Sequence, residues 1–124
     1  MTDILVTDTG FAPNDGKRSH FLLCVTQPPE AQIAGLSQAL DVHIPFASSA
    51  DGRGFSLARR LRELGYQGRI IAVGALVCDQ YRHARQSGCD AVLITAEQAQ
   101  KMPEHHWLEQ ARRVPVSYRK RLYA

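Results

Sequence analysis

Four short apolar runs, separated by segments with helical spacing, constrain the fold of this chain more than any other feature. The runs cover residues 21–25, 42–46, 69–74 and 91–94. A continuous apolar run of this length is typical of a strand that is covered on both faces. Each gap is long enough for the helical crossover that joins two parallel strands. The pattern therefore predicts an α/β fold, with a small, mostly parallel sheet built from consecutive βαβ units.

The segments between the runs have the spacing of amphipathic helices. Leu57, Leu61 and Leu64 lie on one face of a helix, and Gly65 is placed to end it. A second helix is predicted over residues 76–87.

Proline and capping residues mark three further helix starts. Pro28 with Pro29, and later Pro103, suit the first turn of a helix. Thr95 and Gln98 have the spacing of a capping box, in which the Thr95 hydroxyl accepts from the Gln98 amide. The Gln98 side chain then reaches back to the start of the helix.

The rest of the chain is predicted to complete one domain over residues 1–124, with an irregular segment over 1–20. Within that segment a short strand over 4–6 would pair with residues 21–25 if 14–16 form a hairpin turn. A final strand is predicted over 114–118. An open doubly wound sheet and part of a β/α barrel both fit this pattern. In either fold, ligands bind at the carboxyl ends of the strands.

The composition bounds the class of protein and its partners. Apolar residues make up 44% of the chain and charged residues 22%, so a soluble globular domain is expected. The formal net charge is +3, and much of the excess lies at Arg59, Arg60, Arg62 and in residues 112–121. Such clusters are either solvated surface or attract an anion or an acidic partner. No basic stripe interleaves with aromatic residues, so nucleic acid is not predicted as a partner.

The absence of long apolar runs predicts a cytoplasmic protein. No run approaches the roughly 18 residues of a membrane span, and Asp3 lies in a start that does not resemble a signal peptide. The three cysteines lack metal or redox spacing and are predicted to be reduced thiols. Cys24 is expected in the core, and Cys78 and Cys89 are expected to be inert. His105 and His106 are predicted to form a surface pair, without a metal site.

Residues 51–56 form the main candidate site, because they join a strand to a helix. Gly52 and Gly54 permit a close backbone approach, and the helix start offers free N–H groups to an anion. Arg53 adds a bidentate donor, and Ser56 adds a hydroxyl. The alternative is structural: Asp51 or Ser56 caps the helix and the glycines form a turn.

The loop does not match a nucleotide-binding fingerprint. Leu57 stands where a third glycine is needed, and Val73 with Gly74 replaces the acidic residue that would bind a ribose. The second junction carries Asp79 and Gln80. Asp79 either favours the helix dipole or faces the same opening as Arg53, where it would pair with an arginine or act as a base.

Several of these residues together resemble a known bacterial family, the domain of unknown function 934. The resemblance covers about residues 42–95, and 116–118 are similar to that family's C-terminal strand. It rests on the run 51–59 followed by the later pair Asp79 and Gln80. This chain departs from the family at Ala75, where an acid is usual, at Cys78, where an arginine is usual, and in its shorter N-terminal region. By resemblance, the positions of interest are Asp51, Gly52, Arg53, Gly54, Ser56, Arg59, Asp79 and Gln80.

The resemblance implies a pathway more than a reaction. Members are commonly encoded beside sulfite reductase and are described as oxidoreductases of sulfite reduction. We therefore expect an accessory protein of assimilatory sulfite reduction that binds a small anion or docks on the reductase. The alternatives are a small oxidoreductase or other enzyme acting on a phosphorylated or sulfur-containing metabolite, and a protein-interaction domain. No cofactor motif is visible, and the sequence leaves a homo-oligomer open.

Overall fold

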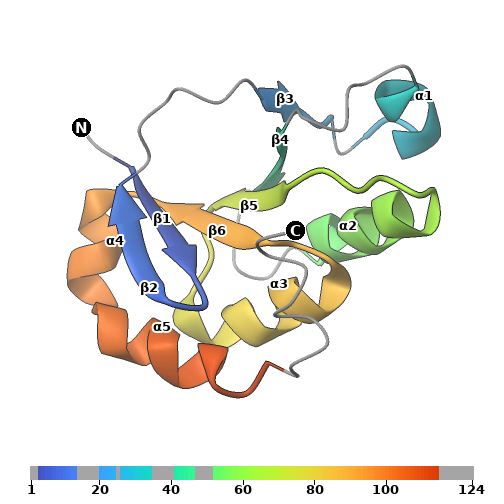
Figure 1. Cartoon of the computed structure of the whole chain (residues 1–124). Coiled ribbons are helices and arrows are strands. Elements are labelled where there is room, and N and C mark those ends of the chain that lie inside the picture. The colour runs from blue at the N-terminus through green and yellow to red at the C-terminus, as the bar shows by residue number, and fades with distance from the viewer. Residues whose placement is uncertain (1–2, 14–19, 25, 35–40, 47–51, 115–124) are drawn as a thin grey trace.

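The computed structural model describes residues 3–13, 20–24, 26–34, 41–46 and 52–114, which form an α/β domain. Figure 1 shows the sheet with helices beneath it. The strands are β1 (Ile4–Thr7), β2 (Gly10–Pro13), β3 (His20–Leu22), β4 (Asp41–Phe46), β5 (Ile70–Gly74) and β6 (Ala91–Ile94). The helices are α1 (Pro29–Ile33), α2 (Arg53–Glu63), the 3₁₀ turn η1 (Cys78–Gln80), α3 (Tyr81–Ser87), α4 (Ala96–Lys101) and α5 (Glu104–Ala111).

The described strands form one open, mixed sheet in the order β2-β1-β6-β5-β4-β3. The four strands from β3 to β6 are parallel to one another. β1 is antiparallel to both β2 and β6. The α/β class and the mostly parallel sheet are therefore confirmed, and the sheet is open rather than closed into a barrel.

The start of the chain differs from its predicted arrangement. β1 and β2 form a hairpin within the segment that was expected to be irregular. β1 pairs with β6 on its other side, so the predicted pairing of residues 4–6 with 21–25 is wrong. The reason is burial: Val6 is fully buried beside Val92, a contact with no local sequence signal. The predicted turn at 14–16 lies outside the described residues.

The first apolar run is an edge strand rather than a central one. β3 covers only His20–Leu22 and has β4 as its one neighbour in the described sheet. Leu22 is 61% exposed, whereas Leu23 is fully buried. Cys24 is exposed, which corrects its expected place in the core, because the chain has already left the strand there. Its backbone N–H donates to Gln32 Oε1 at 2.7 Å.

The second predicted helix begins later than expected. Val77 is extended, η1 follows it, and α3 starts only at Tyr81. The capping box predicted before α4 is confirmed, since Gln98 N donates to Thr95 Oγ1 at 3.2 Å and Thr95 N donates to Gln98 Oε1 at 2.9 Å. Residues 115–118 of the predicted last strand lie outside the described residues.

The main core lies between the sheet and helices α2, α3 and α5, which share one side of the sheet (Figure 1). Alternate residues of each strand point into it, as the pleat of a sheet requires. The strands contribute Val6, Val42, Ile44, Phe46, Ile70, Ala72, Val92 and Ile94, and the helices contribute Phe55, Ala58, Leu61, Tyr81, Ala84, Trp107 and Ala111. A smaller cluster of Ile71, Ala91 and Leu93 lies on the opposite face.

The amino ends of the parallel strands are closed by ion pairs whose carboxylates have little exposure. Arg62 pairs with Asp90 at 2.7 Å, Arg69 with Asp41 at 2.7 Å, and Arg85 with Asp8 at 3.0 Å. Tyr81 Oη also donates to Asp8, which ties the β1–β2 turn to α3. These contacts fix where the helices end and the strands begin.

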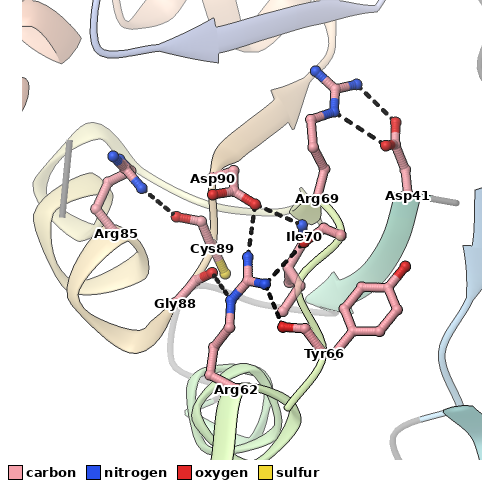
Figure 2. Close-up of polar contacts among 10 residues, drawn as sticks. Asp41, Arg62, Tyr66, Arg69, Ile70, Arg85, Gly88, Cys89 and Asp90 are labelled. Carbon is pink, nitrogen blue, oxygen red and sulfur yellow. Dashed lines mark hydrogen bonds and ion pairs between the residues drawn. The ribbon is translucent and has the colours of Figure 1, made fainter. Parts of the chain in front are cut away.

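The Arg62 guanidinium makes polar contacts with several separate segments (Figure 2). Its guanidinium donates to the Asp90 carboxylate, which also accepts from Ile70 N at 3.0 Å. Its other hydrogen bonds go to the carbonyl oxygens of Tyr66 (2.7 Å), Gly68 (2.8 Å) and Gly88 (3.0 Å). One side chain thus joins the end of α2 to the starts of β5 and β6.

Replacing Arg62 with methionine should destabilise the domain strongly. The change leaves the Asp90 carboxylate, which is 3% exposed, without its cation. Loss of one partner of such a pair costs about 3–5 kcal/mol. Arg60→Met is the matched control, because the Arg60–Glu30 pair is 48% and 45% exposed and should contribute about 0–1 kcal/mol. Urea unfolding measures both, and equal losses would contradict the assignment.

Stability should also fall in acid because of a stacked histidine pair. The rings of His20 and His43 are 4.1 Å apart and nearly parallel. Burial, and then the His20 imidazole, lower the pKa of His43 below its ordinary value of 6.5, with Asp41 opposing and Arg69 adding to this effect. The unfolded chain therefore binds this proton more tightly than the folded one. The free energy of unfolding should decline as the pH drops below about 6.5 and through the folded pKa.

His43→Phe tests this pH dependence, because it keeps a ring for the stack and removes the titrating group. Urea unfolding between about pH 7.5 and 5 should show a shallower decline than in the parent protein. His105→Phe on α5, an exposed position, is the control and should leave the slope unchanged. An unaltered slope in His43→Phe would show that other groups cause the acid sensitivity.

Candidate anion-binding site

Both predicted junctions lie at the carboxyl edge of the parallel strands. α2 follows β4 and η1 follows β5, and these two strands are neighbours, with Phe46 opposite Gly74. Ala75 N donates to Phe46 O at 3.1 Å, which joins the two strand ends. The loop before α2 and the turn at η1 therefore follow the same edge of the sheet.

Two glycines are needed at this edge for packing. A Cβ on Gly54 would overlap the Phe46 ring. Gly74 has φ +119°, and a Cβ there would meet the Phe46 carbonyl oxygen. Both positions thus require glycine for close approach and, at Gly74, for backbone conformation. Gly54 therefore serves the packing of α2 on β4.

Gly52 differs from these two glycines. It is the N-cap of α2 with φ −85° and ψ −3°, which any residue can adopt. No atom of the described residues lies within 4 Å of a Cβ built on it. Within that part of the chain, neither space nor conformation requires glycine here, and Gly52 is exposed.

The first turn of α2 has an open positive end within the described residues. Gly52 offers no capping side chain, and the first turn contains no acidic residue. Ser56 lies inside α2 and does not cap it, so the predicted alternative in which Ser56 caps the helix is wrong. Asp51, the other proposed cap, lies outside the described residues.

Three polar side chains follow one another along α2. Arg53, Ser56 and Arg59 are all exposed. Because they are spaced by three residues, each is a neighbour of the next on the helix surface. The structure thus brings three of the predicted site residues into one row that begins at the carboxyl edge.

The side chains of the second junction, Asp79 and Gln80, contact residues other than Arg53. The Asp79 carboxylate accepts from Gln110 Nε2 of α5 at 3.4 Å rather than pairing with Arg53. Gln80 Oε1 accepts from Val77 N at 3.1 Å and so stabilises the η1 turn to which Gln80 belongs. Asp79 and Gln80 therefore share the edge with Arg53 without joining the row on α2.

Contacts of two side chains at this edge were missed by sequence reasoning. The His83 ring stacks on Phe55 with centroids 4.1 Å apart, beside the start of α2. Gln98 Nε2 donates to Gly74 O at 2.9 Å and Leu76 O at 3.3 Å, in addition to its role in the capping box. Both contacts join segments far apart in sequence, so spacing alone gives no signal for them.

The three cysteines are free thiols in different surroundings. Burial raises the pKa of Cys89 to about 12. Burial, and then the Asp79 carboxylate, also raise the pKa of Cys78. A hydrogen bond with the Thr26 hydroxyl lowers the pKa of exposed Cys24. Cys24 therefore forms a thiolate more readily than the two thiols near α3.

The described residues contain neither a cluster of metal ligands nor a membrane-spanning helix. No three His, Cys, Asp or Glu side chains gather there as a metal site would need. No described helix has the length and apolar character to cross a membrane. His105 and His106 are exposed on α5, with ring centroids 4.2 Å apart.

Comparison with known families identifies the chain. A family model described as "Bacterial protein of unknown function (DUF934)" matches residues 22–123. The chain belongs to the DUF934 family. No curated protein and no solved structure matches it. The region shared with the DUF934 model contains both junctions and the Arg62 contacts, whereas β1 and β2 precede it.

The two glycines of the loop should respond differently to substitution. Gly54→Ala forces α2 away from Phe46, and overpacking of this kind costs about 1–3 kcal/mol. Gly52→Ala meets open space and should cost less than about 1 kcal/mol, the difference between N-cap residues. Thermal unfolding measures both. If Gly52→Ala proved as damaging as Gly54→Ala, the view of Gly52 as structurally unnecessary would be wrong.

Proposed function

We propose that this DUF934 protein is a cytoplasmic accessory protein of assimilatory sulfite reduction that binds a small anion at residues 51–56. The open positive end of α2, with Arg53 in its first turn and Gly52 exposed before it, carries the anion-binding part. The pathway part rests on the family resemblance. The proposal also includes an arrangement in consecutive βαβ units, which would place such loops at one edge of the sheet.

A helix start attracts anions for two physical reasons. Its first N–H groups lack partners within the helix, and the aligned peptide dipoles amount to about half a positive charge there. In α2 no acidic side chain occupies the first turn to neutralise that charge. Sulfite, sulfate and phosphate oxygens are suitable acceptors for these donors.

The side chains of α2 would add direct contacts. The Arg53 guanidinium presents a planar fork that matches two oxygens of an oxyanion. Ser56 and Arg59 continue the row along the exposed surface. Because these groups are exposed, water and salt screen the attraction, so we expect modest affinity that falls with ionic strength.

Thermal unfolding and calorimetric titration with sulfite, sulfate and phosphate test the anion site. A bound anion at a hundred times its Kd stabilises the fold by about 2.7 kcal/mol. Arg53→Ala and Gly52→Ala should each lose most of this shift, the first by removing the fork and the second by obstructing the backbone. Arg112→Ala is the control, because Arg112 is exposed on the far end of α5 and pairs with Glu109.

The outcomes separate the parts of the proposal. No stabilisation by any of these anions, or an equal loss in Arg112→Ala, would overturn the anion site. The pathway is tested by growth of a deletion strain on sulfate as its sole sulfur source. Restoration by the parent gene but not by Arg53→Ala is expected, and normal growth of the deletion strain would contradict the pathway.

A further inference from the structure

We propose that the outer surface of α2 and α3 docks on an acidic patch of a partner protein. This surface, the α2–α3 face, comprises Arg59, Arg82 and His83 with Ser56 and Gln86. It shares Ser56 and Arg59 with the row along α2, but it does not require an anion to be bound at residues 51–56. The inference rests on which cations of the described chain have no partner and where they lie.

Ion pairing distinguishes Arg59 and Arg82 from most other basic residues. Both are exposed, and within the described chain neither makes an ion pair or hydrogen bond. Seven other arginines and lysines of the described residues form ion pairs, and several of these are on exposed surfaces. They are Arg60, Arg62, Arg69, Arg85, Lys101, Arg112 and Arg113.

The two unpaired arginines lie on one surface because α2 and α3 pack side by side (Figure 1). The Phe55–His83 stack joins the helices near their starts. The bond from Arg62 Nε to Gly88 O joins them near their ends. Arg59 lies one turn beyond Phe55, on the side of α2 toward α3. Arg82 precedes His83 on α3, and both side chains are exposed.

The acidic side chains nearest in sequence do not neutralise this face. Glu63, one turn beyond Arg59, lies 3.8 Å from the Arg60 guanidinium. Asp79 faces Gln110 of α5. Within the described chain neither acid pairs with Arg59 or Arg82, so both guanidinium groups are available to an acidic surface.

A protein fits this face better than nucleic acid or a membrane. Tight binding to DNA uses about 6–10 phosphate contacts, and anionic membranes are held by clusters of about 4–8 basic residues. Two exposed arginines match a protein interface instead, where arginine is one of the residue types that carry much of the binding energy. Arginine also pairs bidentately with carboxylates.

An oligoglutamate peptide added to ¹⁵N-labelled protein provides the test. We expect amide shifts centred on Arg59, Arg82 and His83 that diminish with salt. Arg59→Glu/Arg82→Glu should weaken binding about tenfold or more, because attraction becomes repulsion. Arg112→Glu/Arg113→Glu, just after α5, changes the net charge equally and should weaken binding less than about twofold.

Three outcomes would overturn the docking surface. The first is a set of shifts confined to the basic residues near the C-terminus, and the second is equal weakening of peptide binding by the Arg112→Glu/Arg113→Glu control. The third is tighter binding of a DNA duplex or a phosphatidylserine vesicle at the same residues. If the charge reversal disturbs the spectrum of the free protein, Arg59→Gln/Arg82→Gln replaces it. Gly52→Ala should leave peptide binding intact, so failure of the anion site and failure of the docking surface are distinguishable.

Discussion

The position of α2 depends on the Arg62 guanidinium. Its donors are taken up by three carbonyl oxygens and by Asp90, all at the amino edge of the parallel strands. A cation with so little exposure is tolerated only when its donors are satisfied in this way. Because Asp90 also accepts from Ile70 N, the Arg62–Asp90 ion pair connects α2, the start of β5 and the turn before β6. The end of α2 is thereby fixed, and its start must lie at the opposite edge.

At that opposite edge the two loop glycines have different roles. Gly54 and Gly74 both pack on Phe46, which draws the start of α2 close to the strand ends. Gly52, two residues before Gly54, takes no part in this contact, and no described atom lies close to a Cβ built on it. Fold and candidate site thus use neighbouring glycines for separate purposes. A sequence pattern alone assigns both to one motif, and only the packing of Phe46 separates them.

Local features of the fold were predictable from the sequence, and long-range ones were not. β4, β5, β6, α2 and the Thr95–Gln98 capping box follow from periodicity and short spacing. The edge position of β3 depends on which strand lies beside it, so Cys24 was wrongly placed in the core. The pairing of β1 with β6 and the stack of His83 on Phe55 join distant segments. Neither of these two contacts produces a periodic pattern in the sequence.

The proposed anion site and the α2–α3 face share one helix, so their charges must interact. Arg53 and Arg59 are separated by six residues, or about 9 Å of helix at 1.5 Å per residue. That separation is close to the Debye length of about 8 Å at physiological ionic strength. A bound anion would reduce the positive potential felt by an acidic partner, and by linkage the partner would weaken anion binding equally. Since the groups are exposed and one Debye length apart, this antagonism is small in the cell and grows as salt is removed.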